Sequence, residues 1–394
     1  MAVFDVVFSS GGTKAVAFAG AIEVLTRRGA HSVRRLAGTS AGAIACTLLA
    51  SGYTAAECIK AFGGVDGKSP FADFLEPPKA DDVLEAVRGP DSETRELLRG
   101  AVVRAVDKFL DGVSEKVPRV GIGLKLAVGV GRPELYDKAF DAFFAGEKAA
   151  STRLSHLLGF LEFGGFFDVK PVTDWITAMI TAKVNGFRPD WSMERFHAAT
   201  GRDMTVVVAD TTDKRALYLN HRTAPDCPLV DAVRMSMSIP MVWPEVPWRA
   251  EWGKYLGDAI TGHFCVDGGA VLNMPIALFA TPNDPAVKRV MGDPPVPAGN
   301  PLGLWLDDTL AVPGDIEAPV IRRSKVGDRL TRLVETATRW EDEIIRRFEA
   351  FVCRVPSNGY SATEFTASPA RMRVLTDAGR DAMATHLKNR PLVP

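Results

Sequence analysis

Short apolar runs and longer helical patterns alternate along the first 60 residues. Residues 3–8 form an apolar, β-branched run typical of a strand, which the serines and glycines of residues 9–12 end. Residues 15–28 repeat apolar positions at the spacing of one helix face. Residues 33–36 predict a second strand, and residues 43–50 predict a buried helix. This alternation predicts an α/β fold with a mostly parallel sheet.

The same rhythm resumes after residue 168. The pattern predicts helices over residues 172–182, 193–200 and 229–237, and strands over residues 204–209, 216–219 and 264–266. Residues 282–301 are rich in Pro, Gly and Asp and are expected to form a loop. The remaining expected elements are a strand over 302–306, a long amphipathic helix over 326–351 and a last helix over 372–387.

Residues 66–165 have a different character. Residues 98–109 and 135–143 each carry an apolar stripe at helical spacing. Between them, residues 120–130 form a short apolar run that glycines interrupt. We expect a helical insertion over the core here rather than a separate domain.

Composition agrees with a globular protein of this architecture. Of the 394 residues, 46% are hydrophobic and 24% are charged, which excludes a disordered chain and leaves enough apolar surface for a sizeable core. We therefore expect a three-layer α/β/α domain over residues 1–280, with the helical insertion at about 66–165. Residues 281–394 are expected to pack a strand and helices on the same domain.

The net charge, the N-terminal residues and the length of the apolar runs indicate which partners and which location to expect. Lys and Arg total 47 against 48 Asp and Glu, so no strong global field favours nucleic acid or an anionic membrane. The N-terminal residues run directly into the first strand, without the basic and apolar segments of a signal peptide. No stretch reaches the roughly 18 apolar residues of a membrane span. The expectation is a cytoplasmic protein that binds no nucleic acid.

The cysteine pattern points away from disulfides and structural zinc. The five cysteines are scattered, odd in number and never spaced as C-x-x-C: Cys46, Cys58, Cys227, Cys265 and Cys353. Free thiols in a reducing compartment fit this pattern best. The His, Asp and Glu residues show no metal-ligand spacing either, and adjacent pairs such as Asp307 and Asp308 are expected to be solvated surface. We expect no metal site.

Residues 38–42 read Gly-Thr-Ser-Ala-Gly, after a short strand and before an apolar helix. That context suits a nucleophile elbow, in which a sharp turn aims the Ser40 hydroxyl outward. Gly38 and Gly42 would let strand and helix approach without Cβ clashes. The pentapeptide alone is a weak signal, because small residues also form ordinary turns.

Residues 10–14, Ser-Gly-Gly-Thr-Lys, lie between the first strand and the first helix. Successive N–H groups there can form a nest that binds an anion, including the oxyanion of a tetrahedral intermediate. A plain Gly-rich turn is the alternative. The G-x-x-x-x-G-K spacing of a phosphate-binding P-loop is absent.

Asp267, Gly268 and Gly269 follow the apolar strand 264–266. An Asp at the carboxyl end of a strand is placed like a catalytic base, although an Asp-Gly turn is an equally ordinary reading. The three motifs occur in order and each stands at a strand end. That joint arrangement is much harder to obtain by accident.

On these residues the chain resembles the patatin-like phospholipases. That family has a Gly-rich loop with Lys or Arg, then G-x-S-x-G, then D-G-G or D-G-A. Further echoes lie at residues 20–25, 236–240 and 273–275 and in the closing stretch 365–379, so the resemblance covers most of the chain. Ser10 and Ala15 depart from the family's glycines at the two ends of the loop.

The resemblance implies a three-layer patatin-like fold and a Ser–Asp dyad without a catalytic histidine. Ser40 would be the nucleophile and Asp267 the base in hydrolysis of membrane phospholipid or another lipid ester, with no cofactor. Backbone N–H groups of Gly11, Gly12, Thr13 and Ala41 would bind the oxyanion. The motif-supporting residues would be Ser10, Lys14, Gly38, Gly42, Gly268 and Gly269.

The positions of the histidines do not suit a catalytic triad. None of the six histidines follows Asp267 in a short loop, as a Ser-Asp-His triad would need, and His263 is expected to be structural.

Two alternative functions stay open: an acyltransferase using the same acyl-enzyme, and a catalytically silent binding protein on this fold. For peripheral contact with a membrane, the candidates are residues 120–130 and the aromatic group Phe140, Phe143 and Phe144.

Overall fold

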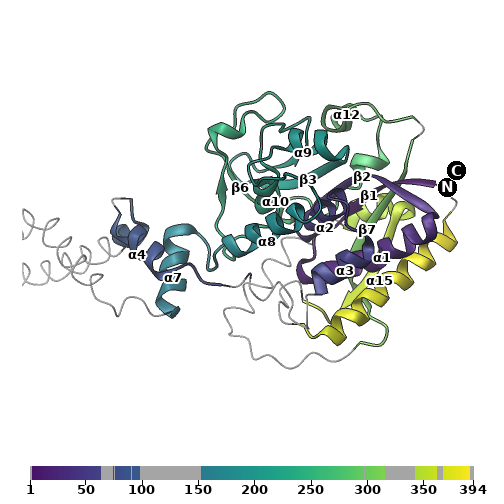
Figure 1. Cartoon of the computed structure of the whole chain (residues 1–394), viewed down its shortest axis with the longest axis horizontal. Coiled ribbons are helices and arrows are strands. Elements are labelled where there is room, and N and C mark those ends of the chain that lie inside the picture. The colour runs from purple at the N-terminus through teal and green to yellow at the C-terminus, as the bar shows by residue number, and fades with distance from the viewer. Residues whose placement is uncertain are drawn as a thin grey trace, which may run out of the picture. The chain divides into compact units, whose positions relative to one another are not determined.

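The computed structural model divides the chain into two compact units (Figure 1). It describes residues 2–63, 74, 76–89, 91–97, 152–296, 298–315, 342–361 and 367–390. The larger unit comprises residues 1–75, 169–240 and 245–394, and the smaller unit comprises residues 76–168 and 241–244. The run 120–130 and the aromatic group at 140–144 lie outside the described residues, so their roles stay predictions.

A mixed, mostly parallel sheet forms the centre of the larger unit. Its described strands are β1 (Ala2–Phe8), β2 (His31–Thr39), β3 (Asp203–Asp210), β4 (Arg215–Leu219), β5 (Val246–Pro247), β6 (Phe264–Asp267), β7 (Asn300–Ala311) and β8 (Val352–Asn358). Their order is β5-β6-β3-β2-β1-β7-β8, and β4 pairs with β3. Strands β3, β2, β1, β7 and β8 run parallel, whereas β4, β5 and β6 form the antiparallel pairs.

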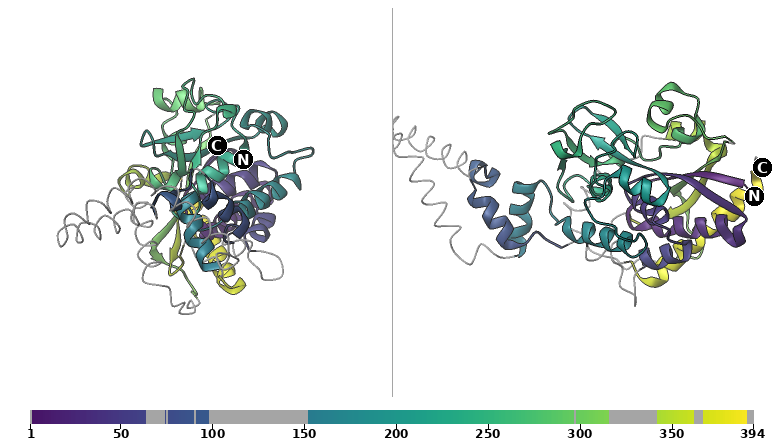
Figure 2. Two further views of the ribbon diagram at one scale, coloured as in Figure 1. Left: turned by 90° about the vertical axis from the view of Figure 1, so that its left-hand side faces the viewer. Right: turned by 45° about the horizontal axis from the view of Figure 1, so that its top comes forward.

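Helices cover both faces of this sheet (Figure 1, Figure 2). The larger unit contains α1 (Val16–Thr26), α2 (Ala41–Ala50), α3 (Ala55–Gly63), α8 (Lys170–Thr181), α9 (Met193–Thr200), α10 (Leu229–Met237), α11 (Ala277–Ala280), α12 (Pro285–Met291), α14 (Asp342–Arg347) and α15 (Pro369–Asn389). The smaller unit contains α4 (Ala80–Arg88) and α7 (Thr152–Phe163). The short 3-10 helices that the site uses are η1 (Gly12–Ala15) and η6 (Gly268–Ala270).

Strand β1 shows how the sequence builds three layers. Its residues are buried almost throughout, as expected for a parallel strand that has helices on both faces. On one face the Phe8 ring packs edge-on against Phe18 of α1. On the other face Val7 joins an apolar cluster with Phe279 of α11 and Met291 of α12. The chain therefore has the predicted three-layer α/β/α architecture.

Close contact between α1 and α15 depends on two glycines (Figure 1). A Cβ at Gly20 would lie 2.1 Å from the carbonyl oxygen of Thr376, and a Cβ at Gly379 would lie 2.1 Å from that of Ala17. Only glycine permits this approach of the two backbones. The C-terminal helix is thereby packed on the first helix of the chain.

The sequence-based elements needed correction in the C-terminal third. The expected loop at 282–301 contains α12, which begins after the N-cap Asp284 with Pro285 in its first turn. Of the expected helix at 326–351, residues 326–341 lie outside the described residues, and the rest forms α14 and a short 3-10 turn. The following residues form β8, a strand that the local pattern did not predict. The strand expected at 302–306 extends over 300–311 as β7. Both strand errors arise because pairing with a distant strand overrides a short local pattern.

The structure also bears on the cysteines and on membrane-spanning helices. The five cysteines are unpaired and buried, as expected of free thiols. No helix within the described ranges is long and apolar enough to cross a bilayer.

Candidate active site

Ser40 stands on a sharp turn between β2 and α2. Its backbone has φ 56° and ψ −123°, in a region that non-glycine residues seldom adopt. A Cβ at Gly38 would lie 2.3 Å from the carbonyl oxygen of Gly42, and one at Gly42 would lie 2.5 Å from that of Phe8. The two glycines thus permit the tight strand-to-helix turn. This is the strained geometry expected of a nucleophile elbow.

Asp267 ends β6 and lies directly against Ser40. The Ser40 hydroxyl donates a hydrogen bond of 2.5 Å to Oδ2 of Asp267. The other carboxylate oxygen accepts the backbone N–H of Gly269 at 2.7 Å, which makes Asp267 the N-cap of η6. Both side chains are buried. The fold therefore brings together two sequence-predicted residues that are 227 positions apart.

Gly268 allows this approach of β6 to the neighbouring strand. A Cβ at Gly268 would lie 2.3 Å from the carbonyl oxygen of Val207 in β3. Gly269 supplies the N–H that holds the carboxylate. The close approach thus requires glycine at 268, whereas Gly269 acts through its main chain.

Burial changes the acid–base character of Asp267. Loss of solvent raises the pKa of its carboxyl group from 3.8 to about 7, against the lowering effect of the hydrogen bonds from Ser40 and Gly269. The charged form is costly in an apolar environment, so the carboxylate retains a proton more readily than an exposed aspartate. At neutral pH such a group can take up or release a proton.

The Gly-rich loop lies between β1 and η1, beside the turn that carries Ser40. A Cβ at Gly42 would also lie 2.7 Å from the carbonyl oxygen of Ser9, so the start of α2 abuts the start of this loop. Gly12 has φ 56°, a left-handed conformation that favours glycine. The N–H of Ser10 donates to the side-chain oxygen of Asn273 at 2.7 Å. The structure therefore assembles loop and elbow at one place.

Lys14 and Thr13 anchor the other side of the loop. The Lys14 side chain is 6% exposed, and its ammonium lies 2.6 Å from Oδ1 of Asp308, which also accepts the hydroxyl of Ser357. The Thr13 hydroxyl donates to the carbonyl oxygen of Ser361 at 3.2 Å. The loop is therefore held by residues from the C-terminal part of the chain.

The pair Asp307 and Asp308 is not the solvated surface that the sequence suggested. Asp307 is fully buried and accepts the Arg354 guanidinium at 2.6 Å, and Asp308 pairs with Lys14. The signal that could have shown this is the position of the two residues. Both stand late in β7, which runs parallel to β1, and the carboxyl end of β1 leads into the loop. Carboxyl ends of adjacent parallel strands share one edge of a sheet.

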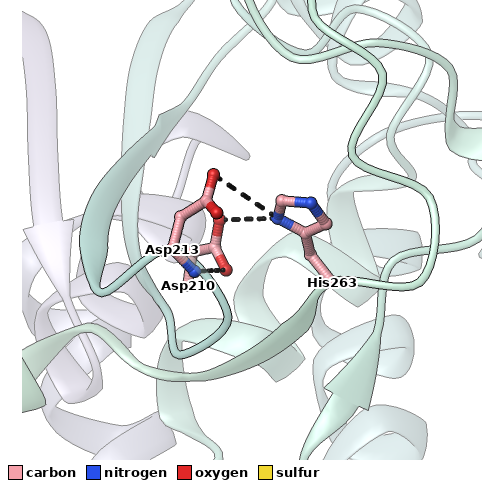
Figure 3. Close-up of side chains that lie close together, drawn as sticks. All are labelled: Asp210, Asp213 and His263. Carbon is pink, nitrogen blue, oxygen red and sulfur yellow. Dashed lines mark hydrogen bonds and ion pairs between the residues drawn. The ribbon is translucent and has the colours of Figure 1, made fainter.

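One group of side chains resembles a set of metal ligands. Asp210, Asp213 and His263 place one ligand atom each within 4.8 Å of one another (Figure 3). His263 Nδ1 lies 2.9 Å from Asp210 and 3.9 Å from Asp213, and Arg215 lies 3.4 Å and 3.2 Å from the same two carboxylates. Arg215 thus already supplies the positive charge that a bound metal ion would bring to these two carboxylates. The group is best understood as an ion-pair network that ties β3, β4 and the start of β6.

His263 therefore serves that network and not Asp267. The hydrogen bonds that lower the pKa of Asp267 come from Ser40 and Gly269, while the ring of His263 binds Asp210. The structural role expected for His263 agrees with this contact. Within the described residues, the arrangement at Ser40 is a serine–carboxylate pair.

The sequence that forms this site matches a known protein family. Residues 6–280 match the family described as patatin-like phospholipase. The chain belongs to the patatin-like phospholipase family. The matched region contains the Gly-rich loop, the Ser40 turn and the Asp267 motif.

The individual relatives match this chain either over a short segment or at low sequence identity. A Bacillus subtilis protein, "Uncharacterized protein YqhO", is 52% identical over 64 residues, which is 16% of this chain and 22% of that protein. The crystal structure of VipD from Legionella pneumophila matches with a TM-score of 0.43 and 13% identity, covering 99% of this chain and 67% of that one. The ExoU–SpcU complex of the Pseudomonas aeruginosa type III secretion system matches with a TM-score of 0.37 and 14% identity, covering 99% and 52%. The family assignment therefore rests on residues 6–280.

Proposed function

We propose that this chain hydrolyses fatty-acyl esters of phospholipids or lysophospholipids through an acyl-enzyme on Ser40, with Asp267 as the base. The observation that carries the proposal is the 2.5 Å hydrogen bond from the Ser40 hydroxyl to Asp267, on a strained turn. A serine hydroxyl is a weak nucleophile until an adjacent base accepts its proton. In this site the carboxylate is that base.

The reaction has two steps, acylation of Ser40 and hydrolysis of the acyl-enzyme. Asp267 accepts the Ser40 proton as Oγ attacks the acyl carbonyl, and the resulting oxyanion collapses with loss of the alcohol, which takes the proton from Asp267. Water then attacks the acyl-enzyme, gives its proton to Asp267 and releases the fatty acid as Ser40 recovers its hydrogen. A base whose pKa is about 7 is matched to both proton transfers near neutral pH.

Backbone N–H groups are the proposed oxyanion donors. Gly11, Gly12 and Thr13 stand at the start of η1, and Ala41 is the first residue of α2 after Ser40. The N-terminus of α2 adds the favourable end of a helix dipole for a developing negative charge. Fixed donors in a buried site cost no reorganisation during the reaction.

Substrate access and location are part of the same proposal. A lipid ester would be reached by peripheral contact with a membrane, for which residues 120–130 and the group Phe140, Phe143 and Phe144 are the candidates. The net charge of −1 offers no long-range attraction to an anionic bilayer, so docking would depend on local apolar surface. We place the activity in the cytoplasm, with no cofactor in any step.

The test compares the wild type with Ser40→Ala and Asp267→Asn on phospholipid vesicles and on a soluble ester. Mass spectrometry of the lipid products should show free fatty acid and lysophospholipid from the wild type, and a near-complete loss in each variant. Added lysolipid or alcohol should leave the fatty acid as the main product, whereas acyl transfer to that acceptor would indicate a transferase. A folded wild type that releases no product from either substrate would favour the silent binding protein.

A further inference from the structure

The Ser-Met-Ser-Ile-Pro segment at residues 236–240 lies at the end of α10 and reaches the site. Ser236 is fully buried. Its hydroxyl oxygen accepts the backbone N–H of Ser40 at 2.9 Å. A side chain from another part of the chain thus binds the main chain of the residue on the strained turn.

The same hydroxyl makes a second hydrogen bond. It donates to the carbonyl oxygen of Val207 at 2.6 Å. Val207 is the partner of Thr39 in the β2–β3 register, and its carbonyl lies against the Cα of Gly268. One oxygen therefore joins the Ser40 turn to the strand between the two motifs.

Ser238, two residues later, holds the other member of the pair. Its carbonyl oxygen accepts the backbone N–H of Asp267 at 2.9 Å. Its hydroxyl, in contrast, only closes a bond of 2.9 Å to the carbonyl of Arg234 within the same helix end. One turn of chain thus contacts the backbone of both Ser40 and Asp267, through a side chain in one case and a carbonyl in the other.

We infer that Ser236 is a positioning residue, which fixes the Ser40 turn so that its hydroxyl faces Asp267. This inference rests on the proposed function. A hydroxyl suits the task because it accepts one hydrogen bond and donates another at the same time. Alanine would leave the N–H of Ser40 and the carbonyl of Val207 without this link in a buried site, beside a backbone that is already strained.

Three variants separate positioning from mere stability. Ser236→Ala removes both bonds, and Ser236→Cys keeps a somewhat larger group of the same shape but weakens both bonds, since a thiol is a poor donor and acceptor. Ser238→Ala is the matched control, because it removes a fully buried hydroxyl two residues away without touching the Asp267 contact. For each protein we would measure the labelling rate of Ser40 by a fluorophosphonate, kcat and KM on a soluble ester, and the melting temperature.

Ser236→Ala should lower the labelling rate and kcat by about 10- to 100-fold with KM within about threefold, since small misplacement of a reacting group has effects of this size. Ser236→Cys should fall between it and the wild type, and Ser238→Ala should keep the wild-type rates. If Ser236→Ala fails to fold, Ser236→Cys alone decides. Wild-type rates in folded Ser236 variants, or equal losses in Ser238→Ala, would overturn the inference. Absence of labelling in the wild type would instead overturn the proposed function on which it rests.

Discussion

Lys14 and Asp308 form an ion pair of 2.6 Å between the Gly-rich loop and strand β7. The family match ends at residue 280, so this pair ties the loop to a strand beyond the matched region. Other contacts point the same way: the N–H of Ser9 donates to the carbonyl of Leu304, and the Thr13 hydroxyl donates to Ser361. Residues after 280 therefore help to hold the proposed oxyanion loop in place.

The two partners of this ion pair should not be equivalent in stability. Asp308→Asn leaves the buried ammonium of Lys14 without its countercharge, and we expect a loss of about 2 kcal/mol in unfolding free energy. Lys14→Met removes the buried charge itself and should cost about 1 kcal/mol or less, because Asp308 is one-third exposed and still accepts the Ser357 hydroxyl. Urea denaturation measures both values. Asp174→Asn, which breaks the exposed Lys170–Asp174 pair, is the control and should change stability little. A larger loss in Lys14→Met than in Asp308→Asn would contradict this view of the pair.

Gly12 gives a direct test of the proposed oxyanion loop. Gly12→Val should lower kcat on a soluble ester on the order of 100-fold, since a branched side chain at φ 56° displaces a backbone donor. Gly29→Val is the matched control, because Gly29 has φ 69° with nothing within 4 Å of its Cβ position. It carries a similar backbone strain away from the site and should retain activity. Ser10→Gly, at the loop edge, should stay within a few-fold of the wild type. Normal turnover in Gly12→Val would remove this loop from the mechanism.

The pH dependence of hydrolysis should follow the titration of Asp267. Burial raises the pKa of this carboxyl group to about 7, and only its deprotonated form can accept the Ser40 proton. We expect kcat/KM on a soluble ester to rise about tenfold per pH unit at acid pH and to level off above about 7. The fluorophosphonate labelling rate should show the same midpoint. A profile that is flat from pH 5 to 8 would speak against the buried carboxylate as the base.

Stability should depend on pH with the opposite sign. Because the pKa of Asp267 rises from 3.8 to about 7 on folding, the folded protein binds a proton between these values that the unfolded chain has released. The group therefore contributes stability at acid pH that is lost as pH rises from about 4 to about 7. Relative to the wild type, Asp267→Asn should gain up to about 1.4 kcal/mol in unfolding free energy per pH unit across this window. Urea denaturation at successive pH values checks this, and a difference that is constant with pH would be inconsistent with a shifted carboxyl group.

Much of the fold could be predicted from local pattern. Helices α9 and α10 begin and end at the residues that the periodicity predicted, and β1 was found as an apolar run. Strand β8 was missed because its seven residues, which include Arg354 and Pro356, give a weak local signal. Its place is set by pairing with β7, which is a contact distant in sequence.

The site divides in the same way. The motifs around Ser40 and Asp267 could be predicted because each places glycines next to the end of an apolar strand, and the structure leaves no room for a Cβ at Gly38, Gly42 and Gly268. The role of Ser236 and the pairing of Lys14 with Asp308 could not, because they depend on which strands and helices become neighbours in the sheet. The raised pKa of Asp267 depends on burial by many residues together, which no local pattern reports.

The most direct test of the account is covalent labelling of Ser40 by a fluorophosphonate, followed by peptide mass spectrometry. The wild type should carry a single adduct on the peptide that contains Ser40, and Ser40→Ala should carry none. Asp267→Asn should fold and react at least about 100-fold more slowly than the wild type, because its amide cannot accept the Ser40 proton. Labelling of Asp267→Asn at the wild-type rate, or an adduct on a residue other than Ser40, would contradict the serine–aspartate pair.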